Sequence, residues 1–203
     1  MRKKELAIIL SKLKGFRSPK PWLEQYRTPG NVAAELLWLA FTLGDLEGKV
    51  IADLGAGTGV LTVGACLLGA KRVHAVEVDG DALTVLRENV SSMGFEGCVQ
   101  VFKGDVSAFA VRVDTVVMNP PFGAQRKGAD RPFLLKAFEV ADVVYLIHLA
   151  KPEVRRFIEA FVRDNGFLIT HRLTTWLEIP AQFFFHRKRL ARIAVDIYRF
   201  VRA

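Results

Sequence analysis

The stretch that decides the fold is residues 50–59, which read VIADLGAGTG. Five residues of strand character, Val50 to Leu54, run directly into three glycines at alternate positions, and an apolar helical pattern follows from Val60. Glycines at such a turn let the backbone approach a ligand closely and leave the N-terminus of the next helix facing it. The order of strand, glycine loop and helix predicts a binding site for a nucleotide-like cofactor.

Apolar runs of strand length alternate with helical patterns along the rest of the chain. The runs lie at residues 50–54, 73–78, 99–102, 113–118 and 143–149, and the helical patterns begin near Gly59, Asp81, Asp130 and Pro152. This alternation specifies a parallel sheet with helices on both faces. Because Phe167–Thr175 and Ile193–Val201 add two extended segments, we expect an α/β fold with a Rossmann-like, seven-stranded sheet and an antiparallel ending.

The first 48 residues contain no predicted strand. A basic amphipathic helix is expected over Glu5–Leu13, and Asn31 is expected to cap a second helix that runs to about Phe41. Since 203 residues can bury one good-sized core, we expect a single structural domain. Residues 1–48 would form a helical extension packed on the main domain, residues 49–203.

The composition favours a folded protein with a polyanionic partner. Hydrophobic residues at 51% and charged residues at 25% are typical of a globular chain and not of a disordered one, and the formal net charge is +8. Lys and Arg that neutralise phosphates release condensed counterions, so nucleic acid is the leading candidate partner. The alternative is a basic surface that serves only solubility.

The two cysteines, Cys66 and Cys98, lack the paired spacing of a disulfide framework or a zinc site. We therefore expect buried thiols in a reducing cytoplasm. The four histidines show no metal-ligand spacing either. The apolar stretch after Arg2, Lys3 and Lys4 is too short for a signal or membrane segment, so no metal, membrane or targeting function is predicted.

The glycine spacing and the acids at the strand ends indicate which cofactor binds. A dinucleotide fingerprint reads G-x-G-x-x-G, and the third glycine of this loop comes one residue too early for it. Asp53 is expected to hold a cationic aminoacyl group, and Glu77 to accept hydrogen bonds from two ribose hydroxyls. Asp105 could accept from an adenine amino group while Val106 packs on the ring, although a role as helix cap is equally open for Asp105.

A second motif, MNPPFG, occupies residues 118–123 at the end of the fourth predicted strand. Two prolines stiffen the loop and supply no backbone donors, so its carbonyls remain free to accept hydrogen bonds. The Asn119 side-chain oxygen and the Pro120 carbonyl can each accept a hydrogen bond from one N–H of an NH₂ group. This arrangement turns the nitrogen lone pair toward a sulfonium methyl group. Phe122 offers a face on which a base can stack, worth about 1 to 3 kcal/mol. The motif therefore predicts methyl transfer to an amine by positioning, with a rigid turn as the alternative.

With these residues the chain resembles the amino methyltransferases that carry an Asn/Asp-Pro-Pro-aromatic motif. Among them it is similar to the methyltransferase-like 5 family of ribosomal RNA adenine N6-methyltransferases, as an archaeal or thermophile-like member. The likeness covers nearly the whole chain after the N-terminal helix and is carried by residues 23–26 (LEQY), 28, 53–55, 118–123, 185–188 and 195–196. The LEQY element is the more selective, because Asn-Pro-Pro-Phe is shared by enzymes that act on guanine N2.

The resemblance implies a class I methyltransferase fold with S-adenosylmethionine as cofactor and ribosomal RNA as substrate. Together with the glycine loop it assigns cofactor contacts to Gln25, Thr28, Asp53, Gly55, Gly57, Thr58, Val60, Glu77, Asp105 and Val106. The residues expected to hold the target adenine are Asn119, Pro120, Pro121 and Phe122. It also implies a small zinc-containing activator protein as a partner, for which the third strand would offer an apolar edge with Val99, Val101, Phe102, Phe109 and Val111.

Two groups of basic residues are expected to contact RNA. Arg126 and Lys127 follow the MNPPFG motif in a loop with glycines at both ends, which we expect to be mobile and to order over RNA. The other group precedes the last strand and consists of His186, Arg187, Lys188 and Arg189. A solvated charge run is the alternative for this second group.

Other functions stay open at this point. Methylation of guanine N2 or of a protein glutamine would use the same kind of motif. A non-catalytic RNA-binding protein on a methyltransferase fold is disfavoured, because both the glycine loop and Asn119 are intact.

Overall fold

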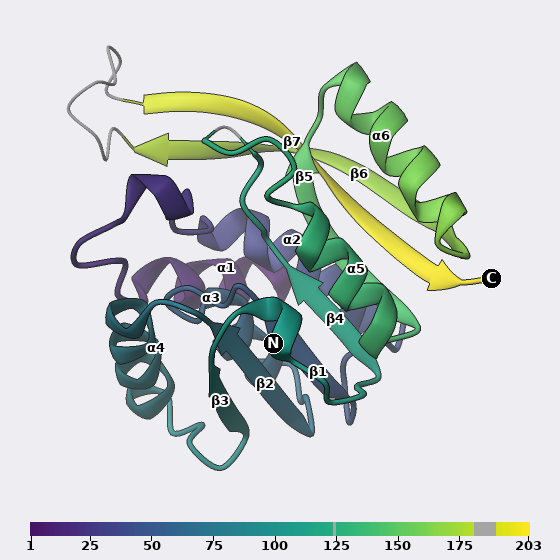
Figure 1. The fold of residues 1–203 in the computed structure, drawn as a ribbon. Coiled ribbons are helices and arrows are strands. Elements are labelled where there is room, and N and C mark those ends of the chain that lie inside the picture. The colour runs from purple at the N-terminus through teal and green to yellow at the C-terminus, as the bar shows by residue number, and fades with distance from the viewer. Residues whose placement is uncertain (124, 181–189) are drawn as a thin grey trace.

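The computed structural model describes residues 1–123, 125–180 and 190–203, and one seven-stranded sheet runs through it in the order β3-β2-β1-β4-β5-β7-β6 (Figure 1). The strands are β1 (Val50–Leu54), β2 (Arg72–Glu77), β3 (Val99–Lys103), β4 (Thr115–Met118), β5 (Val143–Leu149), β6 (Phe167–Pro180) and β7 (Leu190–Arg202). Strands β1 to β5 pair in parallel, whereas β7 is antiparallel to both β5 and β6. The predicted α/β fold with its antiparallel ending is confirmed.

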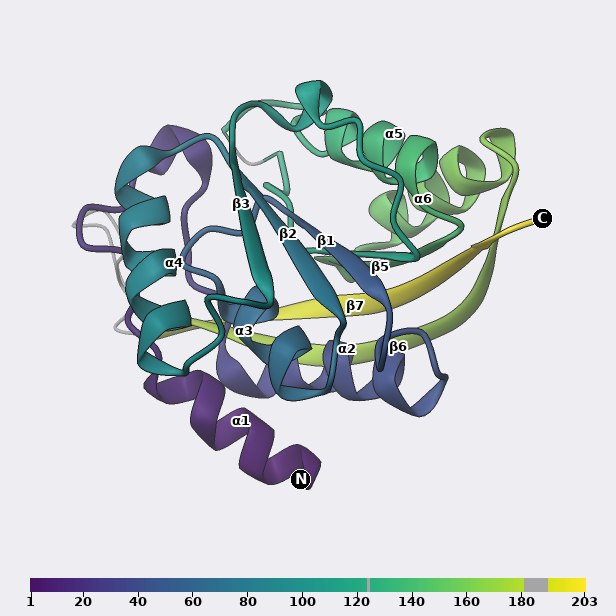
Figure 2. The ribbon, with the colours of Figure 1, turned by 90° about the horizontal axis from the view of Figure 1, so that it is seen from below.

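Helices cover both faces of the sheet. They are α1 (Lys3–Lys12), η1 (Pro21–Leu23), α2 (Gly30–Thr42), α3 (Val60–Leu67), α4 (Gly80–Ser92), η2 (Val106–Ala108), α5 (Arg131–Val140) and α6 (Pro152–Asp164). Figure 2 shows α1, α2 and α3 on one side of the strands and α5 and α6 on the other. Each face has its own hydrophobic core: α1 to α4 supply one, and η2, α5 and α6 supply the other.

The first helix packs closely on the second. Leu6 and Leu10 of α1 are fully buried in the same core as β1 and α3. A Cβ added at Gly30 would lie 2.3 Å from Ser11 Oγ and 2.5 Å from the Ala7 carbonyl oxygen, so only glycine fits where the helices cross. The expectation that Asn31 caps α2 was wrong, because the helix begins at Gly30 and Pro29 is the capping residue.

The sheet order sets the place of the site. Strand β1 has β2 on one side and β4 on the other, and its last residue, Leu54, is in register with Val76 and Met118. The carboxyl ends of these parallel strands therefore meet at one edge, where the strand order reverses. In open α/β sheets that crevice is where ligands bind.

The two thiols are free but adjacent. Their sulfur atoms lie 2.9 Å apart, with Cys66 buried and Cys98 half-buried, so the expectation of two buried thiols holds only for Cys66. Burial raises the pKa of the Cys66 thiol. Within the described residues, no helix is long and apolar enough to cross a membrane.

Candidate active site

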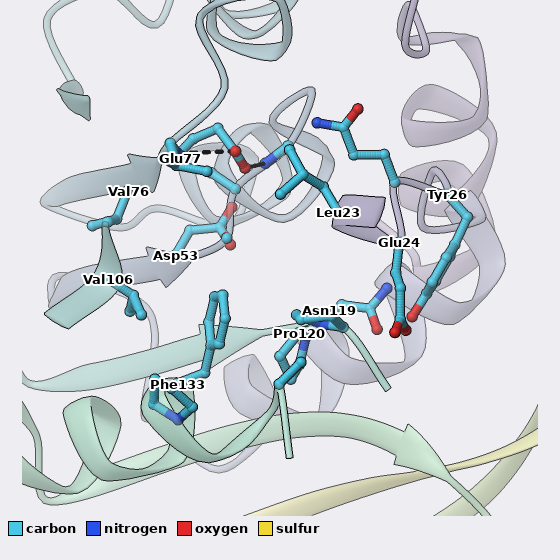
Figure 3. A pocket seen from close by; sticks show the side chains of 18 of the residues that line it. Leu23, Glu24, Tyr26, Asp53, Val76, Glu77, Val106, Asn119, Pro120 and Phe133 are labelled. Carbon is cyan, nitrogen blue, oxygen red and sulfur yellow. Dashed lines mark hydrogen bonds between the residues drawn. The ribbon is translucent and has the colours of Figure 1, made fainter. Parts of the chain in front are cut away.

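A cavity of about 450 Å³ opens at the carboxyl ends of β1, β2 and β4, and residues 22–28 form part of its wall. Most of the predicted site residues line it: Gln25, Thr28, Asp53, Gly55, Gly57, Thr58, Val60, Glu77, Asp105, Val106, Asn119, Pro120, Pro121, Arg126 and Lys127. Figure 3 shows the acids of β1 and β2 on one side and Asn119 with the N-terminal segment on the other. We call the side with Asp53 and Glu77 the cofactor half and the side with Asn119 and Tyr26 the base half.

The glycine loop donates one backbone hydrogen bond to the Glu77 side chain. Gly55, Gly57 and Gly59 all have positive φ, at 75°, 53° and 84°, a conformation that favours glycine. Glu77 Oε2 accepts from the Gly57 N–H at 2.9 Å, and Oε1 accepts from the N–H groups of Val78 and Asp79, each at 2.9 Å. A carboxylate oxygen can accept two bonds, so Oε2 keeps room for one more partner in the cavity.

Asp53 is an almost fully buried acid beneath the glycine loop. Its Oδ2 accepts from the Thr62 hydroxyl at 2.6 Å. Burial raises the pKa of Asp53 to about 7, and the nearby Glu77 charge acts in the same direction. Burial also raises the pKa of Glu77. Two such acids are stabilised in their charged forms by a cationic ligand.

Asp105 serves as a cap in this structure. Its Oδ1 accepts from the N–H of Ser107 at 2.9 Å and from its hydroxyl at 2.5 Å, at the start of η2. Val106 lies in the cavity wall and is 6% exposed. The capping alternative is therefore realised, and contact of either residue with adenine stays a prediction.

Gln25 reaches the cofactor half from the N-terminal segment, but its amide is engaged by protein groups. Its Oε1 accepts from the Lys20 N–H, and its Nε2 donates to Asp79 Oδ2, both at 2.8 Å. The Asp79 carboxylate also forms a salt bridge with the Lys20 ammonium group. Gln25 thus joins residues 20–25 to the start of α4, where Asp79 is the capping residue, a structural bond that the sequence did not predict.

Asn119 is held on one side only. Its Nδ2 donates to the Thr28 hydroxyl at 2.9 Å, whereas its Oδ1 is buried and has no hydrogen-bond partner among the described residues. The Tyr26 hydroxyl is likewise buried without a described partner. An unpaired buried acceptor costs free energy that a ligand donor would recover. The base half thus presents an acceptor that suits an amine.

Phe122 does not line the cavity in this structure. Its ring packs between those of Tyr26 and His148, with centroid distances of 5.3 Å to each. An aromatic side chain that does project toward the cavity is Phe133 of α5 (Figure 3), and it lies against Gly55. The role of Phe122 as a stacking surface for the base remains a prediction, and Phe133 was missed because nothing in its local sequence marks it.

Glu24 was also missed as a site residue. Its carboxylate accepts from the N–H groups of Phe122 and Gln125, each at 2.8 Å. Its backbone is left-handed, with φ of 51°, and it is the one non-glycine residue with positive φ in the described chain. The sequence signal was its place in the LEQY element, which gave no indication of its partners.

The basic residues fall into two groups by location. Arg126 and Lys127 are exposed at the cavity wall. The predicted RNA contacts His186, Arg187, Lys188 and Arg189 lie outside the described residues. In the part of the chain that the structure describes, no cluster of His, Cys, Asp or Glu could hold a metal ion.

Comparison with known proteins identifies the family. The model of the methyltransferase small domain matches residues 31–141. The rRNA N(6)-adenosine-methyltransferase METTL5 of Danio rerio is 36% identical over 98% of this chain and 99% of its own length. The chain belongs to the methyltransferase-like 5 family.

Other members of the methyltransferase-like 5 family match along the same span. The Drosophila melanogaster rRNA N(6)-adenosine-methyltransferase Mettl5 is 35% identical over 98% of this chain and 96% of its own length. A Pyrococcus horikoshii structure, described as a candidate RNA methyltransferase, is 71% identical with a TM-score of 0.96 and covers 100% of this chain and 98% of its own. The chain is thus an S-adenosylmethionine-dependent methyltransferase, and its buried acids suit a ligand with a cationic end and ribose hydroxyls.

Proposed function

We propose that the chain transfers a methyl group from S-adenosylmethionine to the N6 amine of an adenosine in structured ribosomal RNA, with the small subunit as the first candidate. The observation that carries this proposal is the Oδ1 atom of Asn119, which follows β4 and is buried with no hydrogen-bond partner in the described part of the chain. It is supported by full-length similarity to enzymes named as rRNA adenosine methyltransferases.

The proposed mechanism depends on position and not on proton transfer. Asn119 Oδ1 and the Pro120 carbonyl each accept a hydrogen bond from one N–H of the target amine, so the nitrogen lone pair is directed at the methyl group. Thr28 fixes the Asn119 amide by accepting from its Nδ2. When bound, the cofactor would supply a methyl group activated by positive sulfur: the C–N bond would form as the S–C bond breaks, and the methylated amine would release one proton to solvent. Alignment then accounts for most of the rate, and no strong base is needed.

RNA is favoured over protein as the substrate by charge. The chain carries a net charge of +8, and Arg126 and Lys127 are exposed beside the cavity. Phosphates would be neutralised there, whereas a protein glutamine offers no charge to match. Guanine N2 remains the second candidate, because an amine on either purine satisfies the same acceptors.

The setting and the partner belong to the same proposal. The free thiols fit the reducing cytoplasm that we propose.

A small zinc-containing activator would add to β3, which lies at the edge of the sheet with Val99, Val101 and Phe102 half-buried and Val111 45% exposed. Phe109 is 1% exposed and packs beneath this edge, so it is not part of the surface. Light scattering with and without a co-expressed candidate tests the partner: an active monomer that ignores it refutes the idea.

Methyl transfer onto cellular RNA tests the substrate. The purified chain is incubated with tritiated S-adenosylmethionine and total ribosomal RNA, and the digested nucleosides are separated. Label in N6-methyladenosine is the expected result. Label in N2-methylguanosine, or in added protein and not in RNA, would overturn the adenine assignment.

A further inference from the structure

The short segment from Gln25 to Thr28 and its neighbour Glu24 connect the two halves of the cavity. Gln25 bonds Asp79 beside the cofactor half. Tyr26 packs on Phe122, and Thr28 accepts from Asn119. Glu24 accepts two hydrogen bonds from the backbone of the loop after Asn119, and among the described residues no other residue of this segment bonds that backbone.

The partners of Glu24 follow from the chemistry of the loop. Pro120 and Pro121 have no N–H, so the Phe122 N–H is the first backbone donor after Asn119. One Glu24 oxygen takes that donor, and the other takes the N–H of Gln125. Charge-assisted bonds of this kind are stronger than neutral ones. The carboxylate therefore holds the loop backbone at two points, Phe122 and Gln125.

The backbone of Glu24 supports a functional reading. A left-handed residue with a side chain is strained, and such strain persists only where the surroundings impose it. A glycine at this position would remove the strain, but it would also remove both bonds. The strain is thus the cost of bringing a carboxylate to this point.

We propose that Glu24 is a positioning residue for methyl transfer, whose carboxylate fixes the loop 119–125 so that Asn119 Oδ1 faces the target amine. The inference rests on the proposed function for its substrate, but the hold on the loop can be measured without any substrate. Residues 24–28 would then align the acceptor atom, Asn119 Oδ1, in addition to forming part of the cavity wall.

Two variants separate the carboxylate from the backbone. Glu24→Gln keeps the shape but leaves one oxygen, so it loses one loop bond and sets an NH₂ group against the other N–H. Glu24→Gly suits the left-handed backbone, which protects folding, and loses both bonds. The matched control is Glu35→Gln, which removes the charge from the 2.8 Å pairing of Glu35 with Lys3, two residues that do not line the cavity.

The experiment combines three measurements on the full chain. Single-turnover transfer to ribosomal RNA at saturating cofactor should fall about tenfold in Glu24→Gln and about a hundredfold in Glu24→Gly, the scale of a small misplacement at a reacting centre. Affinity for S-adenosylmethionine by calorimetry should change less than about threefold. Hydrogen exchange in peptides spanning residues 119–125 should speed up in both variants without RNA, and Glu35→Gln should match the wild type throughout.

The outcomes are distinct. Wild-type transfer rates in Glu24→Gly, or unchanged exchange of the loop, would overturn the role of Glu24. A loss of cofactor affinity as large as the loss of rate would also overturn it, since Glu24 would then act on the cofactor. If the wild type does not methylate RNA while exchange still rises in the variants, the proposed substrate fails and the hold of Glu24 on the loop is supported.

Discussion

The two halves of the cavity differ in how their polar atoms are satisfied. In the cofactor half, Glu77 accepts three backbone N–H groups and Asp53 accepts the Thr62 hydroxyl. In the base half, Asn119 Oδ1 and the Tyr26 hydroxyl are buried without a described partner. The acids of the cofactor half are held by hydrogen bonds within the protein, and the base half leaves two buried oxygens for a ligand.

This difference indicates which half of the cavity discriminates between ligands. A site satisfied by backbone bonds keeps its shape whether or not the ligand is bound. A site with an unpaired buried acceptor instead rejects ligands that lack a matching donor, because the desolvation cost is then not recovered. Side-chain changes in the cofactor half should therefore lower the affinity for the cofactor. Changes in the base half should lower the transfer rate or weaken RNA binding, with cofactor affinity nearly unchanged.

The largest effect is expected at Asn119. Asn119→Ala should lower methyl transfer by on the order of 10² to 10³, the scale for deletion of one preorganised polar group at a reacting centre. Affinity for S-adenosylmethionine should stay nearly intact, because the prolines keep the loop shape. Asn119→Asp should keep more activity, since a carboxylate also accepts from NH₂. Single-turnover rates at saturating cofactor measure this, and a wild-type rate for the alanine variant would make the loop a structural turn.

The opposite result is expected at Glu77. Glu77→Ala should weaken S-adenosylmethionine binding roughly tenfold to a hundredfold, because it removes charged acceptors and frees the Gly57 N–H. The rate at saturating cofactor should change less than the affinity does. Calorimetry with S-adenosylmethionine and, as a control, NAD decides the point: binding of NAD, or an unchanged affinity in the variant, would contradict the assignment.

Two phenylalanines sharpen the comparison further. Phe122→Ala should raise the KM for RNA about tenfold if the ring stacks the target base, and Phe122→Tyr should be partly tolerated. Phe133→Ala, next to Gly55, should weaken the cofactor instead and leave the KM for RNA unchanged. Steady-state kinetics with each substrate varied in turn separates the two. An exchange of these effects would place the base against Phe133.

The smallest effect is expected at the exposed cations. Neutralising Arg126 and Lys127 together should flatten the dependence of log affinity for RNA on log salt by about 1.4, or about 0.7 for each lost contact with a single strand. Cofactor affinity should not respond, since both side chains are exposed. Binding titrations at several salt concentrations provide the slope. A slope that does not change would remove this loop from the interface.

The cofactor half could be predicted from sequence because its parts are contiguous. Residues 50–59 supply a strand, a loop and a helix start within one stretch, and the sheet order then brings β2 and β4 alongside. Hydrophobic periodicity specified strand β1 to the residue. Asp53 and Glu77 followed from their places at strand ends.

The base half could be predicted only in part, because its contacts join distant residues. Glu24 and Phe122 are 98 positions apart, and Asn119 and Thr28 are 91 apart. Periodicity does not report such pairs. The packing of Phe122 between Tyr26 and His148 likewise brings together three segments that are distant in the sequence, and no local pattern encodes it.

The close crossing of α1 and α2 bears on how shortened forms of the protein should be read. Deletion of the first helix would remove exposed cations, but it would also uncover Gly30 and take away the buried Leu6 and Leu10, each worth roughly 1.5 to 3 kcal/mol. Gly30 lies two residues after Thr28, which holds Asn119. A truncated protein that fails to methylate would thus report damage at the acceptor as readily as loss of the exposed cations of α1. Charge reversal at Lys4 and Lys12, both exposed, separates the two by leaving the helix crossing in place.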